Sequence, residues 1–206
     1  MKILITNDDG IDAPGLSVLY DLALGLTDAK NIHTVAPAVE QSGVGHAITY
    51  LGAVTLEKRE PRKWVIHGTP ADCIIVGIYE GSKPDLVLSG VNRGNNAGQN
   101  TFYSGTVLDR DLWLNNATRI HYNVNFPPCL AADVQGTQFT TQGFRPGAPF
   151  TTKHIDGQLF VKGTPQQQQD TGIGTDVHAN MMDQIAITPC TTDLTDQTIL
   201  QRLRLP

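Results

Sequence analysis

Near its start the chain reads Lys2-Ile3-Leu4-Ile5-Thr6 and continues at once with Asn7-Asp8-Asp9-Gly10. A short run of apolar residues is typical of a strand that is buried on both faces of a parallel sheet. The polar residues after it predict a turn. Pro14 fits the first turn of a helix, whose leucines recur at helical spacing as far as Leu26. Residues 33–36 predict a second strand, so the first unit is strand–helix–strand.

A similar order follows along the chain. Residues 48–56 and 64–67 alternate as a two-stranded ribbon, and Thr69-Pro70-Ala71-Asp72 predicts the start of a helix that ends at Gly81. Pro84-Asp85-Leu86-Val87-Leu88 predicts another buried strand. Strands and helices in this order indicate the α/β class, here a three-layer Rossmann-like sandwich with a mostly parallel sheet.

The second half of the chain is less regular. Residues 108–120 show helical spacing, residues 122–126 alternate as a strand, and the remainder indicates short strands and turns rather than helices. We expect a Rossmann-like α/β core over residues 1–128 and an irregular, β-rich C-terminal extension over residues 129–206 that packs on it.

Composition excludes several classes of protein. The chain has 206 residues, 40% of them hydrophobic, which is enough for one core. Its 15 basic and 20 acidic side chains give a net charge of −5, which argues against a nucleic-acid partner. No apolar run approaches the roughly 20 residues of a membrane span, and the first one is too short for a signal peptide. We therefore expect a soluble, cytoplasmic protein without a membrane partner.

The cysteines, at 73, 129 and 190, lie too far apart for a metal or redox motif and are expected to be buried thiols.

Three polar clusters follow predicted strands, at residues 7–10, 41–43 and 89–96. In an open α/β sheet, ligands bind beyond the carboxyl ends of the strands, where the winding direction changes. The adjacent carboxylates of Asp8 and Asp9 repel each other unless a cation or hydrogen bonds compensate. Oxygen ligands of this kind suit Mg²⁺, Mn²⁺ or Ca²⁺. The alternative is that these aspartates and Asp12 only cap the following helix.

A second candidate site is Tyr103-Ser104-Gly105-Thr106, which precedes the predicted helix. Free N–H groups at a helix start, with two hydroxyls and a glycine, form a cradle for phosphate, although an ordinary capped loop has the same residues. The sequence has no P-loop, dinucleotide-binding, nucleophile-elbow or H-E-x-x-H motif. An aspartyl-phosphate phosphatase is a further alternative, which Asn7 weakens because it replaces the first carboxylate of that motif.

Several ordered motifs are spread over nearly the whole chain. They are Ile5–Gly10 with Ala13–Gly15, Val35–Pro37, Gln41–Gly43, Gly68–Cys73, Ser89–Asn96, Tyr103–Val107, Asn123–Pro127, Gly174–Asp176, Ile185–Pro189 and Asp193–Thr195. Together they resemble the SurE family, the stationary-phase survival proteins, which are metal-dependent nucleoside monophosphate phosphatases.

The resemblance implies a fold, an assembly and a reaction. The fold is a Rossmann-like N-terminal sandwich with a C-terminal part that exchanges elements between subunits, in a homodimer or homotetramer. The reaction is hydrolysis of nucleoside 5′- and 3′-monophosphates to nucleoside and phosphate. One divalent ion per subunit, such as Mg²⁺ or Mn²⁺, is implied, and its ligands match Asp8, Asp9, Ser42 and Asn92. The residues that match the phosphate-binding part are Asn96, Ser104, Gly105 and Thr106.

Within this expectation, Asp8, Asp9 and Asn96 are the catalytic residues. Asp9 serves mainly as a metal ligand, whereas Asp8 is a candidate both for a ligand and for the base that takes a proton from water. Asn96 orients the phosphate for in-line attack. The alternative is a non-catalytic nucleotide- or metal-binding protein on the same fold.

One junction departs from the family pattern. In SurE proteins a helix and a strand, several tens of residues in all, follow the tyrosine-serine-glycine-threonine motif, whereas here Val107 runs directly into Leu108. A true deletion would remove the helix that faces the phosphate. Because loss of a central strand would leave unpaired backbone and a hole in the core, we favour residues omitted from the sequence at this junction.

Overall fold

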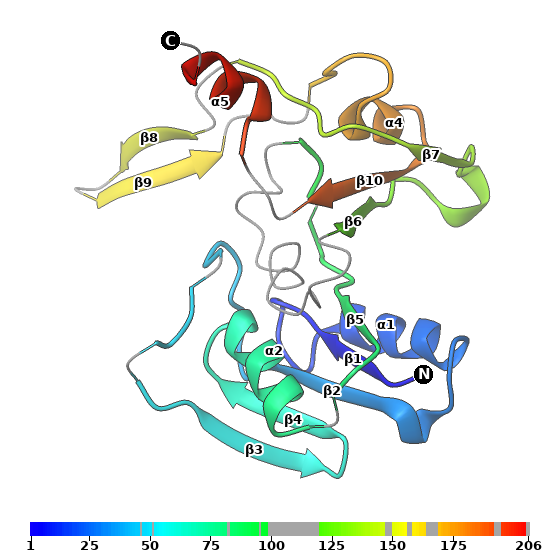
Figure 1. Ribbon diagram of the computed structural model, residues 1–206, viewed down its shortest axis with the longest axis vertical. Coiled ribbons are helices and arrows are strands. Elements are labelled where there is room, and N and C mark those ends of the chain that lie inside the picture. The colour runs from blue at the N-terminus through cyan, green and yellow to red at the C-terminus, as the bar shows by residue number, and fades with distance from the viewer. Residues whose placement is uncertain are drawn as a thin grey trace.

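The structure is a computed structural model of the chain, and its described part has several gaps. It describes residues 1–45, 47–50, 52–81, 83–94, 96–98, 120–146, 150–155, 158–163, 169–191 and 195–204. Figure 1 shows two halves: the first sheet lies with its two helices at one end of the molecule, and the C-terminal strands and helices lie at the other.

The first half is built on a five-stranded sheet. Its strands are β1 (Ile3–Thr6), β2 (Ile32–Pro37), β3 (Thr55–Glu60), β4 (Lys63–His67) and β5 (Leu86–Ser89), in the order β3-β4-β2-β1-β5. The pairs β4–β2, β2–β1 and β1–β5 are parallel, and only the edge strand β3 is antiparallel to its neighbour. The predicted mostly parallel sheet is therefore confirmed, although the ribbon begins at Thr55 rather than at residue 48.

Helices α1 (Pro14–Leu24) and α2 (Pro70–Tyr79) cover opposite faces of this sheet. Successive side chains of a strand point to opposite faces, so β1 contributes to two apolar clusters. Ile3 and Ile5 pack with Leu19 and Ala23 of α1. Leu4 packs on the other side with residues of α2. A strand buried on both faces must be apolar throughout, which explains the composition of β1.

The start of α2 agrees with the prediction from its sequence. Pro70 is the first helical residue, the Thr69 hydroxyl accepts a hydrogen bond from the Asp72 amide (3.2 Å), and the Asp72 carboxylate accepts one from the Thr69 amide (2.9 Å). Such a reciprocal pair satisfies amide groups that have no partner within the helix. Because β4 leads directly into this cap, α2 begins at the carboxyl edge of the sheet.

The C-terminal half contains a three-stranded sheet and a hairpin. The sheet has the order β6 (Ile120–Asn125), β10 (Ile185–Thr191), β7 (Thr137–Phe139), and the hairpin pairs β8 (Phe150–Ile155) with β9 (Gln158–Gly163). Strand β6 lies before the predicted boundary at residue 128 yet pairs with β10. The boundary itself stays a prediction.

Two helices in this half contradict the expectation of strands and turns alone. They are α4 (Asp176–Met181) and α5 (Gln197–Leu203). Short 3₁₀ turns are described at Ala29–Asn31 in the first half and at Ala131–Asp133 in this half. The side chain of Thr175 caps α4 and that of Asp196 caps α5. With six and seven residues, each helix is too short to show a clear hydrophobic period, and the cap is its main sequence signal.

Two simpler expectations can also be compared with the structure. Within the described ranges, no helix is long and apolar enough to cross a membrane. All three cysteines are free, but only Cys73 is buried, whereas Cys129 and Cys190 are partly exposed. The expectation of three buried thiols is therefore wrong for two of them.

Candidate active site

The two loops that carry most of the predicted site begin side by side. Strand β1 leads through α1 to β2 on one side, whereas β4 leads through α2 to β5 on the other side of β1. The winding direction therefore changes between β1 and β5, which is where open α/β sheets bind ligands. Thr6 is paired with Ser89 at the ends of these strands, so the loops after them leave the sheet at the same level.

Asn7 shapes the loop after β1. It is fully buried, its side-chain nitrogen donates to the Gly10 carbonyl (3.0 Å), and its side-chain oxygen accepts from the Gly10 amide (3.2 Å). Gly10 has a φ of 104°, which favours glycine. The closed turn holds Asp8 and Asp9 between its ends, at the carboxyl edge of the sheet.

The aspartates do not cap α1. The N-cap of this helix is Ala13, which makes no side-chain capping bond, so the alternative explanation for the acidic cluster is wrong. Asp8 is buried, with 2% of its surface exposed. Burial and, next, the charge of Asp8 raise the pKa of Asp9, although a hydrogen bond from the Arg93 amide opposes that change. Two carboxylates at this place therefore carry an electrostatic cost that a cation would offset.

Hydrogen bonds join the three predicted polar clusters. The Arg93 amide of the loop after β5 donates to the Asp9 carboxylate (3.2 Å). The Gln41 amide of the loop after β2 donates to the Asp8 carbonyl (2.7 Å). In the loop after β5, the Asn92 side-chain nitrogen donates to the side-chain oxygen of Asn96 (3.2 Å). The loops that the sequence placed at one edge of the sheet are thus in contact.

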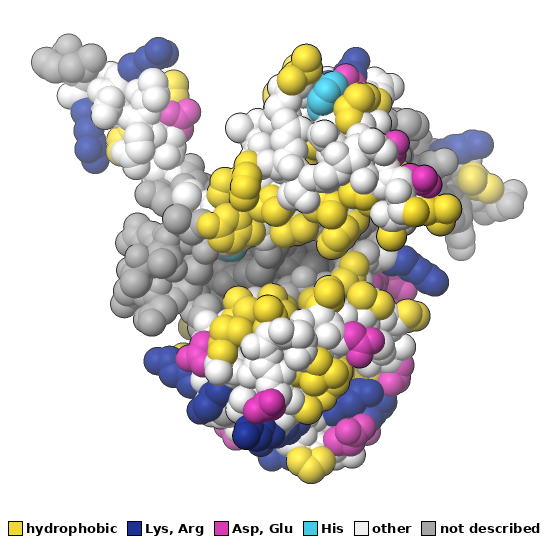
Figure 2. Space-filling model, turned by 90° about the vertical axis from the view of Figure 1, so that its right-hand side faces the viewer, with side chains coloured by type: hydrophobic (Ala, Val, Ile, Leu, Met, Phe, Trp, Pro, Cys, Tyr) yellow, Lys and Arg dark blue, Asp and Glu magenta, His cyan; other side chains and the backbone are white. Residues whose placement is uncertain are grey.

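Two pockets flank the loop after β5. One, of about 520 Å³, is lined by residues 9–15, 38–40 and 91–93, and therefore brings Asp9 and Asn92 together. The other, of about 440 Å³, lies between α1, residues 87–94 and β6, and Asn92 and Asn96 both line it. Figure 2 shows hydrophobic side chains on both sides of a hollow between the two halves. Asn92 lines both pockets.

Not every predicted ligand lines these pockets. Asp8 lines neither, although its carbonyl holds the neighbouring loop. Ser42 lies on that loop, but its side chain is exposed and its hydroxyl donates to the Glu40 carboxylate (2.9 Å). Glu40 lines the larger pocket with Asp9, and its charge contributes to the raised pKa of Asp9. The sequence analysis did not single out Glu40, because a lone glutamate in a loop carries no distinct signal.

The predicted phosphate cradle lies outside the described residues. This applies to Ser104, Gly105 and Thr106, to the junction after Val107, and to the predicted helix over 108–120 except for Ile120, which belongs to β6. Asn96 is therefore the one predicted phosphate-binding residue that the structure describes, and it is partly buried.

The donor set at the carboxyl edge fits a hard divalent cation. No group of three or more histidine, cysteine, aspartate or glutamate side chains that could hold a metal occurs in the parts of the chain that the structure covers. The predicted set does not require one, because it combines two carboxylates with a hydroxyl and an amide. The raised pKa of Asp9 beside Asp8 is the observation that favours a cation here.

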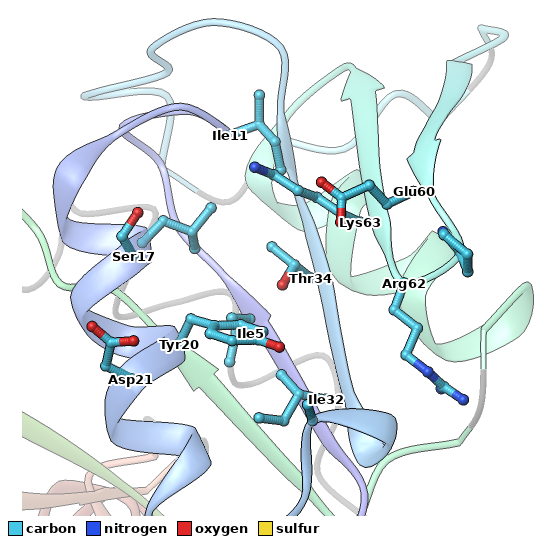
Figure 3. A pocket seen from close by; sticks show the side chains of 13 residues that line it. Ile5, Ile11, Ser17, Tyr20, Asp21, Ile32, Thr34, Glu60, Arg62 and Lys63 are labelled. Carbon is cyan, nitrogen blue, oxygen red and sulfur yellow. The ribbon is translucent and has the colours of Figure 1, made fainter.

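A further pocket, of about 540 Å³, lies away from these residues on the α1 face of the sheet. Figure 3 shows Tyr20 of α1 against Ile5, with Glu60 and Lys63 on the far side of the pocket. None of the predicted site residues lines it.

The fold and the polar residues at the change of winding define a doubly wound, Rossmann-like α/β protein. A family model described as Survival protein SurE matches residues 3–108. The 5′-nucleotidase SurE of Cereibacter sphaeroides is 39% identical over 249 aligned residues and covers 95% of each chain. That of Ruegeria pomeroyi is 39% identical over 258 aligned residues and covers 99% of each. The chain belongs to the SurE family, so the predicted resemblance is confirmed, and with it the nucleotidase class of enzyme.

The comparison with a solved structure agrees. The crystal structure of SurE protein from Aquifex aeolicus matches with a TM-score of 0.79 and 26% identity and covers 98% of both chains. The aligned lengths with the two bacterial relatives exceed the 206 residues of this chain by 43 and 52. These relatives therefore have residues that this chain lacks, and their position after Val107 stays a prediction.

Proposed function

We propose that this protein is a metal-dependent nucleotidase that hydrolyses nucleoside 5′- and 3′-monophosphates to nucleoside and phosphate. The observation that carries the proposal is the hydrogen bond from the Arg93 amide to Asp9, which joins the loops after β1 and β5 beside a pocket. Membership of the SurE family supports the reaction class.

The proposed cofactor is one divalent ion per subunit, Mg²⁺ or Mn²⁺, held by Asp8, Asp9, Ser42 and Asn92. When bound, such an ion offsets negative charge on the phosphate and lowers the pKa of a coordinated water. The Ser42 hydroxyl donates its hydrogen to Glu40, which leaves the lone pairs of its oxygen free to bind a cation. Asn92 would use its side-chain oxygen, since its nitrogen donates to Asn96.

The remaining steps belong to the protein's own residues. Asp8 is buried, and we propose it both as a metal ligand and as the base that accepts a proton from the attacking water. Asn96, together with Ser104, Gly105 and Thr106, orients the phosphate for in-line attack. Among the described residues, the loop contacts of Asp9, Asn92 and Asn96 exist before the substrate binds, so these groups need little further ordering for the reaction.

Asp9→Asn tests the proposal. It removes one negative charge from the metal ligands at almost unchanged volume, so we expect a folded protein with phosphate release reduced at least about 100-fold. The measurement is phosphate release from adenosine monophosphate with Mn²⁺, and EDTA should abolish it until Mn²⁺ or Mg²⁺ is added in excess.

Asp85→Asn is the matched control, because Asp85 lies before β5, at the opposite edge of the sheet, and accepts a hydrogen bond from the Lys2 amide. It should keep wild-type activity. Wild-type turnover by Asp9→Asn, or activity that persists in EDTA, would contradict the assignment. Trapping of a beryllium fluoride adduct on Asp8 or Asp9 would instead support the aspartyl-phosphate alternative.

The second candidate is a non-catalytic nucleotide- or metal-binding protein. It would require that the residues absent relative to the bacterial relatives include the helix that faces the phosphate, whereas the relatives themselves are named as nucleotidases. Such a protein would gain thermal stability with nucleotide but release no phosphate. An intact mass of 22.3 kDa would support a true deletion, whereas a mass several kDa higher would support the omission of residues.

The assembly and location are also proposals. We expect a homodimer or homotetramer formed through residues 129–206, with nucleoside monophosphates and phosphate as the small-molecule partners. A cytoplasmic location, and the lack of nucleic-acid and membrane partners, stay predictions.

A further inference from the structure

Two asparagines of β6 lie on the same face of the strand. Asn123 and Asn125 are separated by one residue, so their side chains point the same way, and both are at least nine-tenths buried. Val124 between them points to the other face and is 42% exposed. Buried asparagine is uncommon in a strand and requires hydrogen-bond partners. The family resemblance includes these residues but assigns them no role.

Both asparagines contact the backbone of the same residue, Asn96. The Asn96 amide donates to the side-chain oxygen of Asn125 (2.8 Å). The side-chain nitrogen of Asn123 donates to the Asn96 carbonyl (3.0 Å). One bond fixes the N–H and the other the C=O, so together they fix the orientation of the backbone on both sides of this residue.

Hydrogen bonds with residues of the C-terminal half hold this arrangement in place. The Asn125 carbonyl accepts a hydrogen bond from the Asn180 side chain (3.1 Å). Next to Asn96, the Gly98 amide donates to the fully buried Asp176 carboxylate (2.7 Å), which also accepts from the Gly143 amide (2.7 Å). The site loop after β5 is thus fixed by residues that lie far from it in the sequence.

We propose that Asn123 and Asn125 are positioning residues for the reaction, which clamp the backbone of Asn96 so that its side chain is held beside Asn92. The proposal rests on the proposed function for its effect on turnover. Asn96 and Asn92 are themselves hydrogen-bonded, so a shift of Asn96 would displace a predicted phosphate-binding residue and a predicted metal ligand together. Displacements of about 1 Å can reduce turnover about 100-fold.

Asn125 accepts a hydrogen bond from Asn96, whereas Asn123 donates one to it. This difference allows a matched test with Asn123→Asp and Asn125→Asp. A carboxylate at position 125 still accepts from the Asn96 amide, whereas a carboxylate at position 123 faces the Asn96 carbonyl and cannot donate to it. Each variant adds one negative charge on the same face of the same strand. A simple effect of charge would therefore act on both alike.

The measurement is kcat and KM for adenosine monophosphate with saturating Mn²⁺ at pH 8, where carboxylates are normally ionised. We expect kcat of Asn123→Asp to be at least about tenfold below that of Asn125→Asp, with KM values within about threefold of each other. Equal kcat values, or a lower kcat for Asn125→Asp, would overturn the proposal.

Thr188→Val is the control for a purely structural role. Thr188 is the register partner of Asn123 in β10, is buried, and shares a hydrogen bond with Thr140 (2.8 Å) that does not involve the site. Its loss should lower the melting temperature but leave kcat unchanged at temperatures where the protein is folded. A fall in kcat equal to that of Asn123→Asp would show that lost stability alone explains the effect.

Amide hydrogen exchange at Asn96 tests this proposal independently of the proposed function. The Asn96 amide should exchange slowly in the wild type and in Asn125→Asp, and at least about tenfold faster in Asn125→Leu, which has no acceptor. If the wild type releases no phosphate with Mn²⁺, the proposed function fails and this exchange pattern still tests the clamp. Equal exchange in Asn125→Asp and Asn125→Leu would exclude it.

Discussion

At the scale of single residues, the hydrogen bonds of Asn7 explain why position 7 carries an amide rather than a carboxylate. Its side chain both donates to and accepts from the backbone of Gly10, and an ionised aspartate cannot donate. The carboxylates of the site are therefore those of Asp8 and Asp9, the two residues that follow Asn7. An aspartate at position 7 would also add a third negative charge to a place where the pKa of Asp9 is already raised.

His33 gives the molecule a predictable response to acid. Burial first, and then the charges of Arg62 and Lys58, lower the pKa of His33 from 6.5 to about 4. Between these values the unfolded chain binds a proton that the folded protein does not, so the free energy of unfolding falls as the pH drops from 6.5 to 4. The pKa difference corresponds to a loss of about 3 kcal/mol.

His33→Phe tests this expectation. Phenylalanine keeps a ring against Trp64, whose ring centre lies 4.1 Å away, and cannot be protonated. The difference in unfolding free energy between pH 7 and pH 4.5, measured with urea, should be smaller by about 2 kcal/mol or more in the variant. An equal loss of stability in the two proteins would show that His33 is not the group responsible.

At the scale of elements, the close approach of α1 to the loop after β5 depends on Gly15. A Cβ atom added there would lie 1.9 Å from the Val91 carbonyl oxygen, and the Val91 amide donates to the Gly15 carbonyl (3.2 Å). The Val91 atoms that this Cβ would meet all belong to the backbone, so the contact cannot be relieved by a change of rotamer. The first turn of α1 and the residue before Asn92 are thus in direct contact.

Gly15→Ala should therefore destabilise the protein by about 3 kcal/mol or more and reduce turnover, because either α1 or the Asn92 loop must move. Gly94→Ala in the same loop is the control: its nearest contact would be the Asn92 side chain at 3.8 Å, which is ordinary packing. The measurements are melting temperature and kcat. A melting temperature for Gly15→Ala close to that of Gly94→Ala would disprove the contact.

The elements differ in how clearly their own sequence predicts them. The strands β1 and β5 are evident from the sequence as apolar runs, whereas β2 is buried throughout although His33 and Thr34 interrupt its apolar residues. Residues 48–54 alternate between apolar and polar, but those of them that the structure describes form no strand, and Tyr50 is 86% exposed. Alternation alone therefore does not establish a strand. Helices α4 and α5 were missed because they are too short to show a period.

The same reasoning applies to the candidate site. Asp9 and Asn92 could be expected near each other because the topology brings the ends of β1 and β5 together. The contacts of Asn96 with Asn123 and Asn125 could not, since they join loops and strands whose relative placement depends on tertiary packing. A polar pair on one strand face shows that partners are needed, but it does not identify them.

At the scale of the whole molecule, the C-terminal half leaves large apolar side chains exposed. The segments at 141–144 and 171–175 lie side by side, joined by the hydrogen bond from the Thr141 amide to the Gly174 carbonyl (3.0 Å). On them Phe144 is 67% and Ile173 is 90% exposed. Exposed apolar side chains on neighbouring segments are typical of an interaction surface, and the proposed partner is a second subunit.

We therefore expect a solution mass of at least twice 22.3 kDa by light scattering. The double variant Phe144→Ser with Ile173→Ser should weaken the assembly at least about tenfold, since apolar side chains at the centre of an interface contribute most to association. Tyr79→Ser is the control: Tyr79 is 81% exposed at the end of α2, in the other half of the molecule, and its loss should leave the mass unchanged. A wild-type protein that is monomeric at micromolar concentration would contradict the proposed assembly. A double variant that dissociates no more readily than the control would place the interface elsewhere on the C-terminal half.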